Sequence, residues 1–244
     1  MRRVSAKLVP RFLTDDQKKS RVEISQELLA NANGNENFTK NIITWDETWV
    51  YGYDVETKMQ LSQWMGKGSP RPKKARMIRS KIKVMSLVFF DWKGIVHHKF
   101  VPRGQMVNKQ LYQEVLGRLR DALRRKRAEF WENQTWIFHH ENAPAHASLS
   151  IRSYLAKCQT SVVPHPPYSP DLVPADLFLF SKIKTTLKGR RFQTIEEIQE
   201  NAIRELRAIT ESAFQEAFQQ WKKRWERCIA NRGDCSEGDR VEML

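Results

Sequence analysis

The sequence predicts an α/β protein in which a mixed sheet is flanked by helices, and three observations support this prediction. Runs rich in β-branched and aromatic residues, typical of strands, dominate 42–53 and 83–101. Apolar residues recur at helical intervals over 108–127. Two short apolar runs, 135–140 and 161–163, then alternate with further helical segments. With 244 residues, the chain is long enough for one large domain or two small ones.

The first half of the chain contains three expected strands and one long helix. Asp46 falls in the middle of the first strand, 42–53. Lys83–Phe90 and Gly94–Val101 are separated by the turn-like sequence Asp91-Trp92-Lys93-Gly94, which is typical of a hairpin. The helix expected over 108–127 is indicated by apolar residues at four-residue intervals, namely Leu111, Val115, Leu119 and Leu123.

Acidic residues stand at the element boundaries expected in the second half. Thr135–His140 is a short apolar strand that ends at Glu141, and 161–163 is another. Pro174 can start a helix whose first turn carries Asp176, because proline is tolerated and acids are favoured at helix N-termini. The complete order is three antiparallel strands, a helix, a strand, a helix, a strand and a helix. This is the order of the ribonuclease H-like fold.

Helices are also expected at both ends of this domain. Thr14-Asp15-Asp16-Gln17 has the form of a capping box and opens a helix, which the polar stretch 32–37 ends. Apolar residues at three- and four-residue steps indicate extra C-terminal helices that pack on the sheet. They are Ile195, Ile198, Ile203, Leu206, Ile209, Phe214, Phe218, Trp221 and Trp225. We therefore divide the chain into a linker and helix at 1–40, a main domain at 41–232 and a flexible tail at 233–244.

Three carboxylates, Asp46, Glu141 and Asp176, come from three of these elements, and 34 residues lie between the last two. Mg²⁺ and Mn²⁺ prefer oxygen ligands. Two such ions about 3.5–4 Å apart can bind both the attacking and the leaving oxygen of a displacement at phosphorus. The pattern therefore predicts a two-metal enzyme that acts on phosphodiesters. Asp171 is a competing third acid, five residues nearer Glu141, and we interpret it as a turn or cap residue.

Longer motifs around these acids carry a family resemblance. The chain reads WDE at Trp45–Glu47, HENAPAH at His140–His146 and YSPDLVPAD at Tyr168–Asp176. These motifs resemble the GDE, HDNAPxH and YSPDLxPxD motifs of mariner-type transposases. The similarity runs from about Arg3 to Gly233.

The resemblance implies a ribonuclease H-like transposase catalytic domain at 41–232. The family's chemistry is metal-dependent cleavage of DNA strands by water, followed by strand transfer by the freed 3′-hydroxyl, which together move and integrate a transposon. Asp46, Glu141 and Asp176 would be the catalytic residues and the ligands of Mg²⁺ or Mn²⁺. The implied partners are DNA and a second copy of the chain, and the implied location is the nucleus. We expect no small-molecule cofactor.

The sequence departs from the family's pattern at two of these positions. Glu141 replaces the second aspartate and is one methylene longer, which moves the carboxylate by about a bond length, so we expect the chemistry to be slowed or lost. Trp45 replaces the glycine beside the first aspartate, and we expect overpacking of about 1–3 kcal/mol and a distorted floor of the site. A catalytically inactive DNA-binding remnant is therefore the rival hypothesis, which shares the fold and the charge.

The N-terminal residues resemble the family's linker. Leu8–Leu13 matches the tryptophan-initiated linker motif, with Leu8 in place of the tryptophan. In the family this linker takes part in pairing two subunits; the alternative is that the helix behind it only covers the sheet. Family members carry paired helix-turn-helix units before this linker, and the present sequence starts after the corresponding position. We therefore expect DNA binding that is largely independent of sequence.

The charge distribution agrees with a nucleic-acid partner. The formal net charge is +14, and the run Lys67–Lys83 holds eight Lys or Arg and no acid. Such a run is also typical of a solvated loop, whereas in the family an insertion at this position serves as a clamp near the partner subunit and DNA. Further basic groups lie on the 108–127 helix and after Asp176. The candidate DNA-binding residues are Lys67, Arg71, Lys73, Lys74, Arg76, Arg79, Lys81, Arg124, Arg125, Lys184 and Lys188.

Other classes of site are not predicted. His139, His140 and His146 surround Glu141, but no Cys or His pair has the ligand spacing of a zinc site. We interpret His146 as a polar group near the metal site or as a structural histidine. The three cysteines suit a reducing intracellular compartment. No apolar stretch approaches 18 residues and no signal peptide opens the chain, so a membrane or secreted role is not expected.

Overall fold

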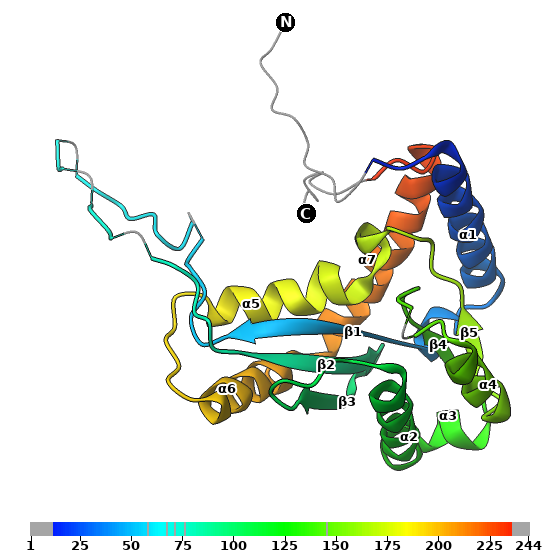
Figure 1. The fold of residues 1–244 in the computed structure, drawn as a ribbon. Coiled ribbons are helices and arrows are strands. Elements are labelled where there is room, and N and C mark those ends of the chain that lie inside the picture. The colour runs from blue at the N-terminus through cyan, green and yellow to red at the C-terminus, as the bar shows by residue number, and fades with distance from the viewer. Residues whose placement is uncertain are drawn as a thin grey trace, which may run out of the picture.

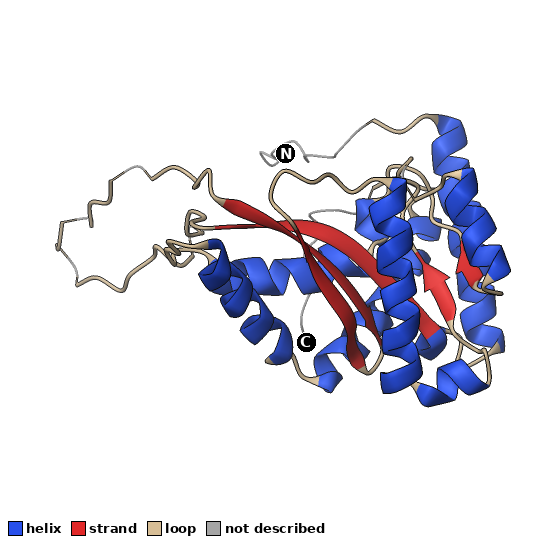
Figure 2. Ribbon diagram, turned by 60° about the horizontal axis from the view of Figure 1, so that its bottom comes forward, coloured by secondary structure: helices blue, strands red, loops and turns tan. Residues whose placement is uncertain are grey.

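A five-stranded mixed sheet lies between two layers of helices (Figures 1 and 2). The computed structural model describes residues 12–235, apart from 58, 67, 71, 76 and 145. The strands are β1 (Ile42–Tyr51), β2 (Lys83–Asp91), β3 (Gly94–Val101), β4 (Ile137–His139) and β5 (Ser161–Val163). The α-helices are α1 (Asp15–Gly34), α2 (Lys109–Lys126), α3 (Ala128–Glu132), α4 (Leu149–Lys157), α5 (Ser181–Leu187), α6 (Ile195–Arg207) and α7 (Glu211–Ala230). Short 3₁₀ segments are η1 (Thr39–Asn41) and η2 (Pro170–Leu172), and η3 (Ala175–Phe180) is a π-helical turn. No helix in the described ranges is long and apolar enough to span a membrane.

The sheet confirms the expected mixed topology. Its strand order is β3-β2-β1-β4-β5, with β1, β2 and β3 antiparallel and with β4 and β5 parallel to β1. The predicted hairpin joins β2 to β3, and the Asp91 carboxylate accepts hydrogen bonds of 2.9 Å from the N–H groups of Lys93 and Gly94. Gly94 has a φ of +130°, which favours glycine at this turn. The order of strands and helices is the one expected of the ribonuclease H-like fold.

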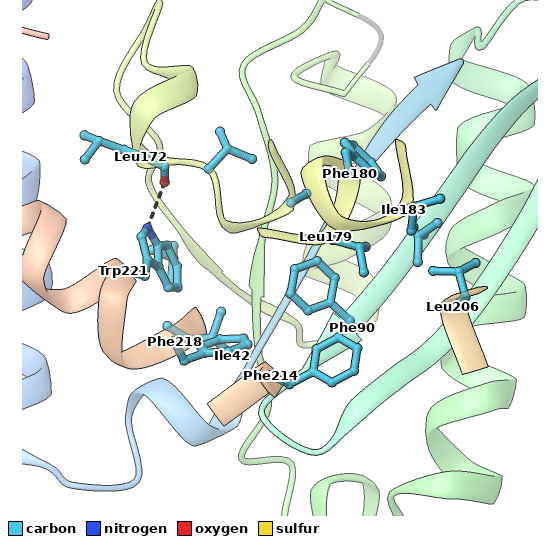
Figure 3. Packing of buried hydrophobic residues seen from close by; sticks show 14 of the residues in the cluster. Ile42, Phe90, Leu172, Leu179, Phe180, Ile183, Leu206, Phe214, Phe218 and Trp221 are labelled. Atoms are coloured by element: carbon cyan, nitrogen blue, oxygen red, sulfur yellow. Dashed lines mark hydrogen bonds between the residues drawn. The ribbon is translucent and has the colours of Figure 1, made fainter. Parts of the chain in front are cut away.

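Each face of the sheet has its own hydrophobic core. Alternating side chains of β1 divide between them: Ile43 and Trp45 pack with α2, whereas Ile42 and Val50 face α5, α6 and α7. On this second face Phe90 packs against phenylalanines of α7 (Figure 3). The extra C-terminal helices are therefore part of the core, as their apolar spacing predicts.

The N-terminal helix α1 lies alongside α7 (Figure 1). The predicted capping box is present: the Gln17 N–H donates to Thr14 Oγ1, and the Thr14 N–H donates to Gln17 Oε1. Leu28 of α1 joins the core on this face. Gly233 and Asp234, which the residue pattern assigned to a tail, contact α1, whereas the tail from 236 onward and most of the linker motif lie outside the described residues.

Trp45 is packed into the core on the α2 face of the sheet. Its indole is 1% exposed and stacks between Phe89 of β2 and Tyr112 of α2, with ring centroids 5.0 and 4.9 Å away. The edge of the ring meets His146 at 4.8 Å. Because neighbours on another strand and on a helix leave room for the indole, Trp45 is a core residue on the α2 face of the sheet.

The described residues between β1 and β2, which are 52–82 apart from 58, 67, 71 and 76, form an arm that extends away from the sheet and carries the described cations of the basic run up to Lys81 (Figures 1 and 2). Strand β1 ends at Tyr51, where the arm begins, and this is two residues before the end expected from the composition of 42–53. At the base of the arm the N–H of Phe192 donates to the Gly52 carbonyl at 2.7 Å, and the N–H of Gly189 donates to the Asp54 carbonyl at 2.9 Å. The arm thus begins from a fixed base next to the C-terminal end of α5.

We predict that Trp45→Gly destabilises the protein instead of relieving strain. Removing a buried indole leaves a cavity, which costs about 3–5 kcal/mol of the free energy of unfolding. Trp45→Phe keeps a stacked ring and should lose less than half of that. Denaturant unfolding of both variants measures the difference. A Trp45→Gly protein as stable as its parent would show that the indole is a strained addition.

Candidate functional site

The pairing of β1 with β4 brings Asp46 and Glu141 together. The two strands are parallel, and their register places Thr44 beside His139. Two residues further along each strand direction stand Asp46, within β1, and Glu141, just past the end of β4. Asp46 lies on the face covered by η3 and α5, since it alternates with Trp45 on the strand.

Asp176 reaches the same point from the opposite side. It stands in the first turn of η3, which packs against β1. One carboxylate oxygen from each of Asp46, Glu141 and Asp176 lies within 4.8 Å of the others, and Asp46 is buried. The structure therefore brings together all three acids selected from the sequence.

Burial and mutual repulsion make these carboxylates difficult to ionise. The pKa of Asp46 is raised well above its usual range by burial and by the charges of Glu141 and Asp176. Burial and Asp176 raise the pKa of Glu141. Burial raises the pKa of Asp176, although the nearby Lys184 opposes the shift. Three acids that repel each other in a part-buried cluster form a site that a cation would stabilise.

The donor set fits Mg²⁺ or Mn²⁺. All three side chains offer hard carboxylate oxygens, and the group contains no thiolate or imidazole. Asp46 keeps a fixed orientation because one carboxylate oxygen accepts the Glu47 N–H at 2.7 Å. Asp46, Glu141 and Asp176 are the residues that could hold such an ion.

A fourth acid, Glu47, lies next to the cluster and was not selected from the sequence. Its carboxylate is part-buried, one of its oxygens has no hydrogen-bond partner, and His146 Nε2 is 3.9 Å away. Burial and the charge of Glu141 raise the pKa of Glu47 to about 7. Its signal in the sequence is its position beside Asp46. His146 is buried against Trp45 and Tyr112, on the α2 face of the sheet, and the carboxylate beside it is that of Glu47.

The two histidines at the end of β4 contact residues other than the three acids. His139 lies within hydrogen-bond distance of Thr44 Oγ1, at 2.8 Å, and of His165, at 3.2 Å. His140 packs toward Tyr112 on the opposite face. These neighbouring histidines therefore point to opposite faces of the strand. Burial and the charge of Arg152 lower the pKa of His140 to about 4.

Asp171 does not belong to the cluster. It is fully buried, and its carboxylate forms a two-pronged ion pair with the guanidinium of Arg21 on α1. Its backbone lies in the 3₁₀ turn η2, so the interpretation as a turn residue describes its backbone but missed the ion pair. The pair joins residues 150 positions apart, and no local pattern indicates it.

The candidate DNA-binding residues fall into two separate groups. Lys73, Lys74, Arg79 and Lys81 lie on the exposed arm, and Lys184 and Lys188 lie on or just after α5, near the base of the arm. The structure does not bring Arg124 and Arg125 to this group, because they end α2 at the far end of the sheet, beside the Arg127–Asp91 ion pair. Lys67, Arg71 and Arg76 lie outside the described residues.

Aromatic rings hold several of the cations near the arm. Lys83 lies 4.0 Å from the ring centroid of Trp49, and Arg79 lies 4.5 Å from that of Tyr51. Arg79 also pairs with Asp54 at 2.8 Å, and Lys74 pairs with Glu56. Part of the arm's positive charge is therefore compensated within the chain.

Comparisons with known proteins agree with these motifs. A family model described as Transposase (partial DDE domain) matches residues 54–133, between Asp46 and Glu141. The chain is 31% identical to the Mariner Mos1 transposase of Drosophila mauritiana over 226 residues, which cover 92% of this chain and 64% of that protein. It is 29% identical to the histone-lysine N-methyltransferase SETMAR of Homo sapiens, over 94% of this chain and 32% of that protein.

The chain also shares its fold with solved structures of the Mos1 transposase. A crystal structure of the mariner Mos1 paired end complex with Mg matches with a TM-score of 0.86 and 30% identity, over 97% of this chain and 68% of the Mos1 chain. The sheet, its flanking helices and the ribonuclease H-like arrangement are therefore those of the Mos1 catalytic domain. The chain belongs to the mariner transposase family.

Proposed function

We propose that this chain cleaves DNA strands with a divalent metal ion and then transfers the freed 3′ end to new DNA. The observation that carries the proposal is the convergence of three carboxylate oxygens, from β1, from the end of β4 and from η3, within 4.8 Å. Membership of the mariner transposase family supports it. Two Mg²⁺ or Mn²⁺ ions between these acids would supply the activation of water or a 3′-hydroxyl and the stabilisation of the leaving oxygen.

In this proposal Asp46 is the central ligand, because it is the most buried of the three and its orientation is fixed by the Glu47 N–H. Glu141 and Asp176 would complete the site from either side. Lys184 lies close enough to favour the ionised form of Asp176. A nicking assay with supercoiled plasmid and either ion tests the proposal, because a catalytic protein converts the plasmid to open circles only when the ion is present.

Glu141 favours a second candidate, a DNA-binding protein of this family without catalysis. The additional methylene displaces one metal-binding oxygen, and about 1 Å of displacement can cost a hundredfold in rate. The two candidates share the fold and the basic surface. They differ in whether any divalent ion supports nicking.

We further propose that the arm and the neighbouring end of α5 contact DNA and a second copy of the chain. The arm carries exposed cations that suit a phosphate backbone. It also exposes large apolar side chains, including Met59, Trp64 and Ile78, which a partner surface would cover. A DNA substrate of this kind implies a nuclear location for the protein.

The first prediction from this proposal concerns Glu141. Nicking by the parent should be weak and stronger with Mn²⁺ than with Mg²⁺, whose octahedral geometry is strict. Glu141→Asp should raise the nicking rate by about tenfold to a hundredfold, because the shorter side chain places its carboxylate oxygen where the family's aspartate places it. Asp176→Ala should abolish nicking and so exclude a contaminating nuclease. If Glu141→Asp folds, binds DNA and cuts with neither ion, the non-catalytic candidate is correct.

The second prediction concerns the arm. Lys73 and Lys81 are exposed, and replacing both by Ala should weaken binding to all DNA sequences alike. The slope of log affinity against log salt should become shallower by about 0.9 for each phosphate that the protein no longer neutralises. Lys157→Ala, at the end of α4, is the matched control and should leave the slope unchanged. Fluorescence anisotropy at several salt concentrations measures both quantities; equal slopes in all three proteins would exclude the arm from DNA contact.

The third prediction concerns pH and Glu47. Its pKa rises from an ordinary 4.5 to about 7 on folding, so its ionisation costs stability progressively between those pH values. Without divalent ions, Glu47→Gln should therefore match its parent near pH 4.5 and exceed it by about 1–3 kcal/mol above pH 7. Denaturant unfolding across this range measures the difference. The same change at the exposed Glu36 should have little effect, and a Glu47→Gln difference that is flat with pH would contradict the inferred burial of charge.

A further inference from the structure

A buried ion pair connects the N-terminal helix to the turn before Asp176. Arg21 of α1 and Asp171 of η2 are both 0% exposed. Arg21 Nη1 and Nη2 donate to the two carboxylate oxygens of Asp171 at 2.8 and 2.7 Å, and Arg21 Nε donates to the Gly233 carbonyl at 2.9 Å. This planar two-pronged geometry fixes the orientation as well as the distance of the two groups.

Helix α7 holds the same turn from a second direction. Trp221 Nε1 donates to the Leu172 carbonyl at 2.8 Å (Figure 3), and Arg224 Nη1 donates to the Asp171 carbonyl at 3.3 Å. The side chain and the backbone of Asp171 and the backbone of Leu172 are therefore all held by α1 and α7.

The short segment between this turn and Asp176 is tightly packed. Residues 171–175 are all buried, and Pro174 restricts the backbone immediately before η3. The N–H of Val173 donates to the Pro170 carbonyl at 3.1 Å, and the N–H of Leu177 donates to the Val173 carbonyl at 3.2 Å. A shift of Asp171 would therefore move the first turn of η3, which carries Asp176.

The other end of the connection is equally fixed. Gly233 has a φ of +82°, and a Cβ at this position would lie 2.2 Å from the Lys18 carbonyl oxygen, so the backbones of α1 and the segment after α7 are in direct contact. Lys18 also pairs with Asp234 at 2.7 Å. Helix α1, the end of α7 and the turn at Asp171 thus form one closed set of contacts.

Stability alone does not explain a pair of this kind. Removing two charges from water is costly, and apolar side chains of similar volume often give an equally stable core. A two-pronged pair differs from an apolar contact in specifying one relative position of its partners.

We propose that Arg21 and Asp171 are positioning residues for the carboxylate of Asp176, so that the seating of α1 sets the geometry of the metal centre. This inference rests on the proposed binding of metal ions by Asp46, Glu141 and Asp176. It assigns to α1 a role beyond covering the core.

The test is the affinity for Mn²⁺, measured by calorimetry at a temperature where every variant is folded. Asp171→Asn keeps the shape of the side chain but leaves Arg21 without its counter-charge, and Arg21→Lys keeps the charge but loses the two-pronged geometry. Both should bind Mn²⁺ about tenfold more weakly than the parent, the lower end of the usual effect of losing support for metal ligands. Leu28→Ala, in the same helix and core, is the control: it should lower the melting temperature and leave the Mn²⁺ affinity unchanged.

Hydrogen exchange on the unaltered protein gives a second measurement that no folding defect can obscure. If α1 and the metal centre are coupled, Mn²⁺ should slow amide exchange at Leu172, at Val173 and in α1 around Arg21, because coupling is reciprocal. Unchanged exchange there, or Mn²⁺ affinity in folded Asp171→Asn equal to the parent's, would overturn the positioning role alone. Failure of the unaltered protein to bind Mn²⁺ would instead overturn the proposed metal-dependent function.

Discussion

The parallel pairing of β1 with β4 is the constraint on which the candidate site depends. Because successive side chains of a strand point to opposite faces, a slip of one residue in β1 would turn Asp46 toward α2 and Trp45 toward η3. The register with His139 beside Thr44 prevents this, since both faces of the sheet are packed with apolar side chains that fit only one alternation. The two cores thus fix the position of a carboxylate that contributes nothing to either of them.

Gathering the acids opposes the stability that these cores provide. Burial raises the pKa values of Asp46, Glu141 and Asp176, and the negative charges of neighbouring acids raise those of Asp46 and Glu141 further. Glu47 adds a fourth part-buried carboxylate with a raised pKa. Such a cluster is less stable ionised than protonated, so its presence is a better indicator of a cation site than of a structural network. The neutral, buried histidines nearby do not compensate it, because burial keeps their pKa low.

Features encoded by local patterns were predictable from the sequence, and features that depend on distant partners were not. Strand-forming composition and short apolar runs located the five strands within a few residues, helical spacing located α2 and the C-terminal helices, and the motifs located the three acids, whereas the short helix α3 was not expected. The fit of Trp45 was missed because its pocket is made by Phe89 and Tyr112, from a different strand and a helix. The Arg21–Asp171 pair was missed for the same reason, since its partners are 150 positions apart. The arm's charge was recognised, but not its compensation by Asp54 and Glu56.

The two departures from the family's motifs have different physical consequences because they face opposite sides of β1. Trp45 is absorbed into the α2 core, where its ring adds stacking contacts and leaves the carboxylates on the other face. Glu141 has no such compensation, since its additional methylene acts within the cluster itself, where the distance between oxygens decides what can bind. If the proposed cleavage is slow, we therefore expect Glu141 and not Trp45 to be the cause, because a glycine at position 45 would remove core packing without changing the position of the Glu141 carboxylate.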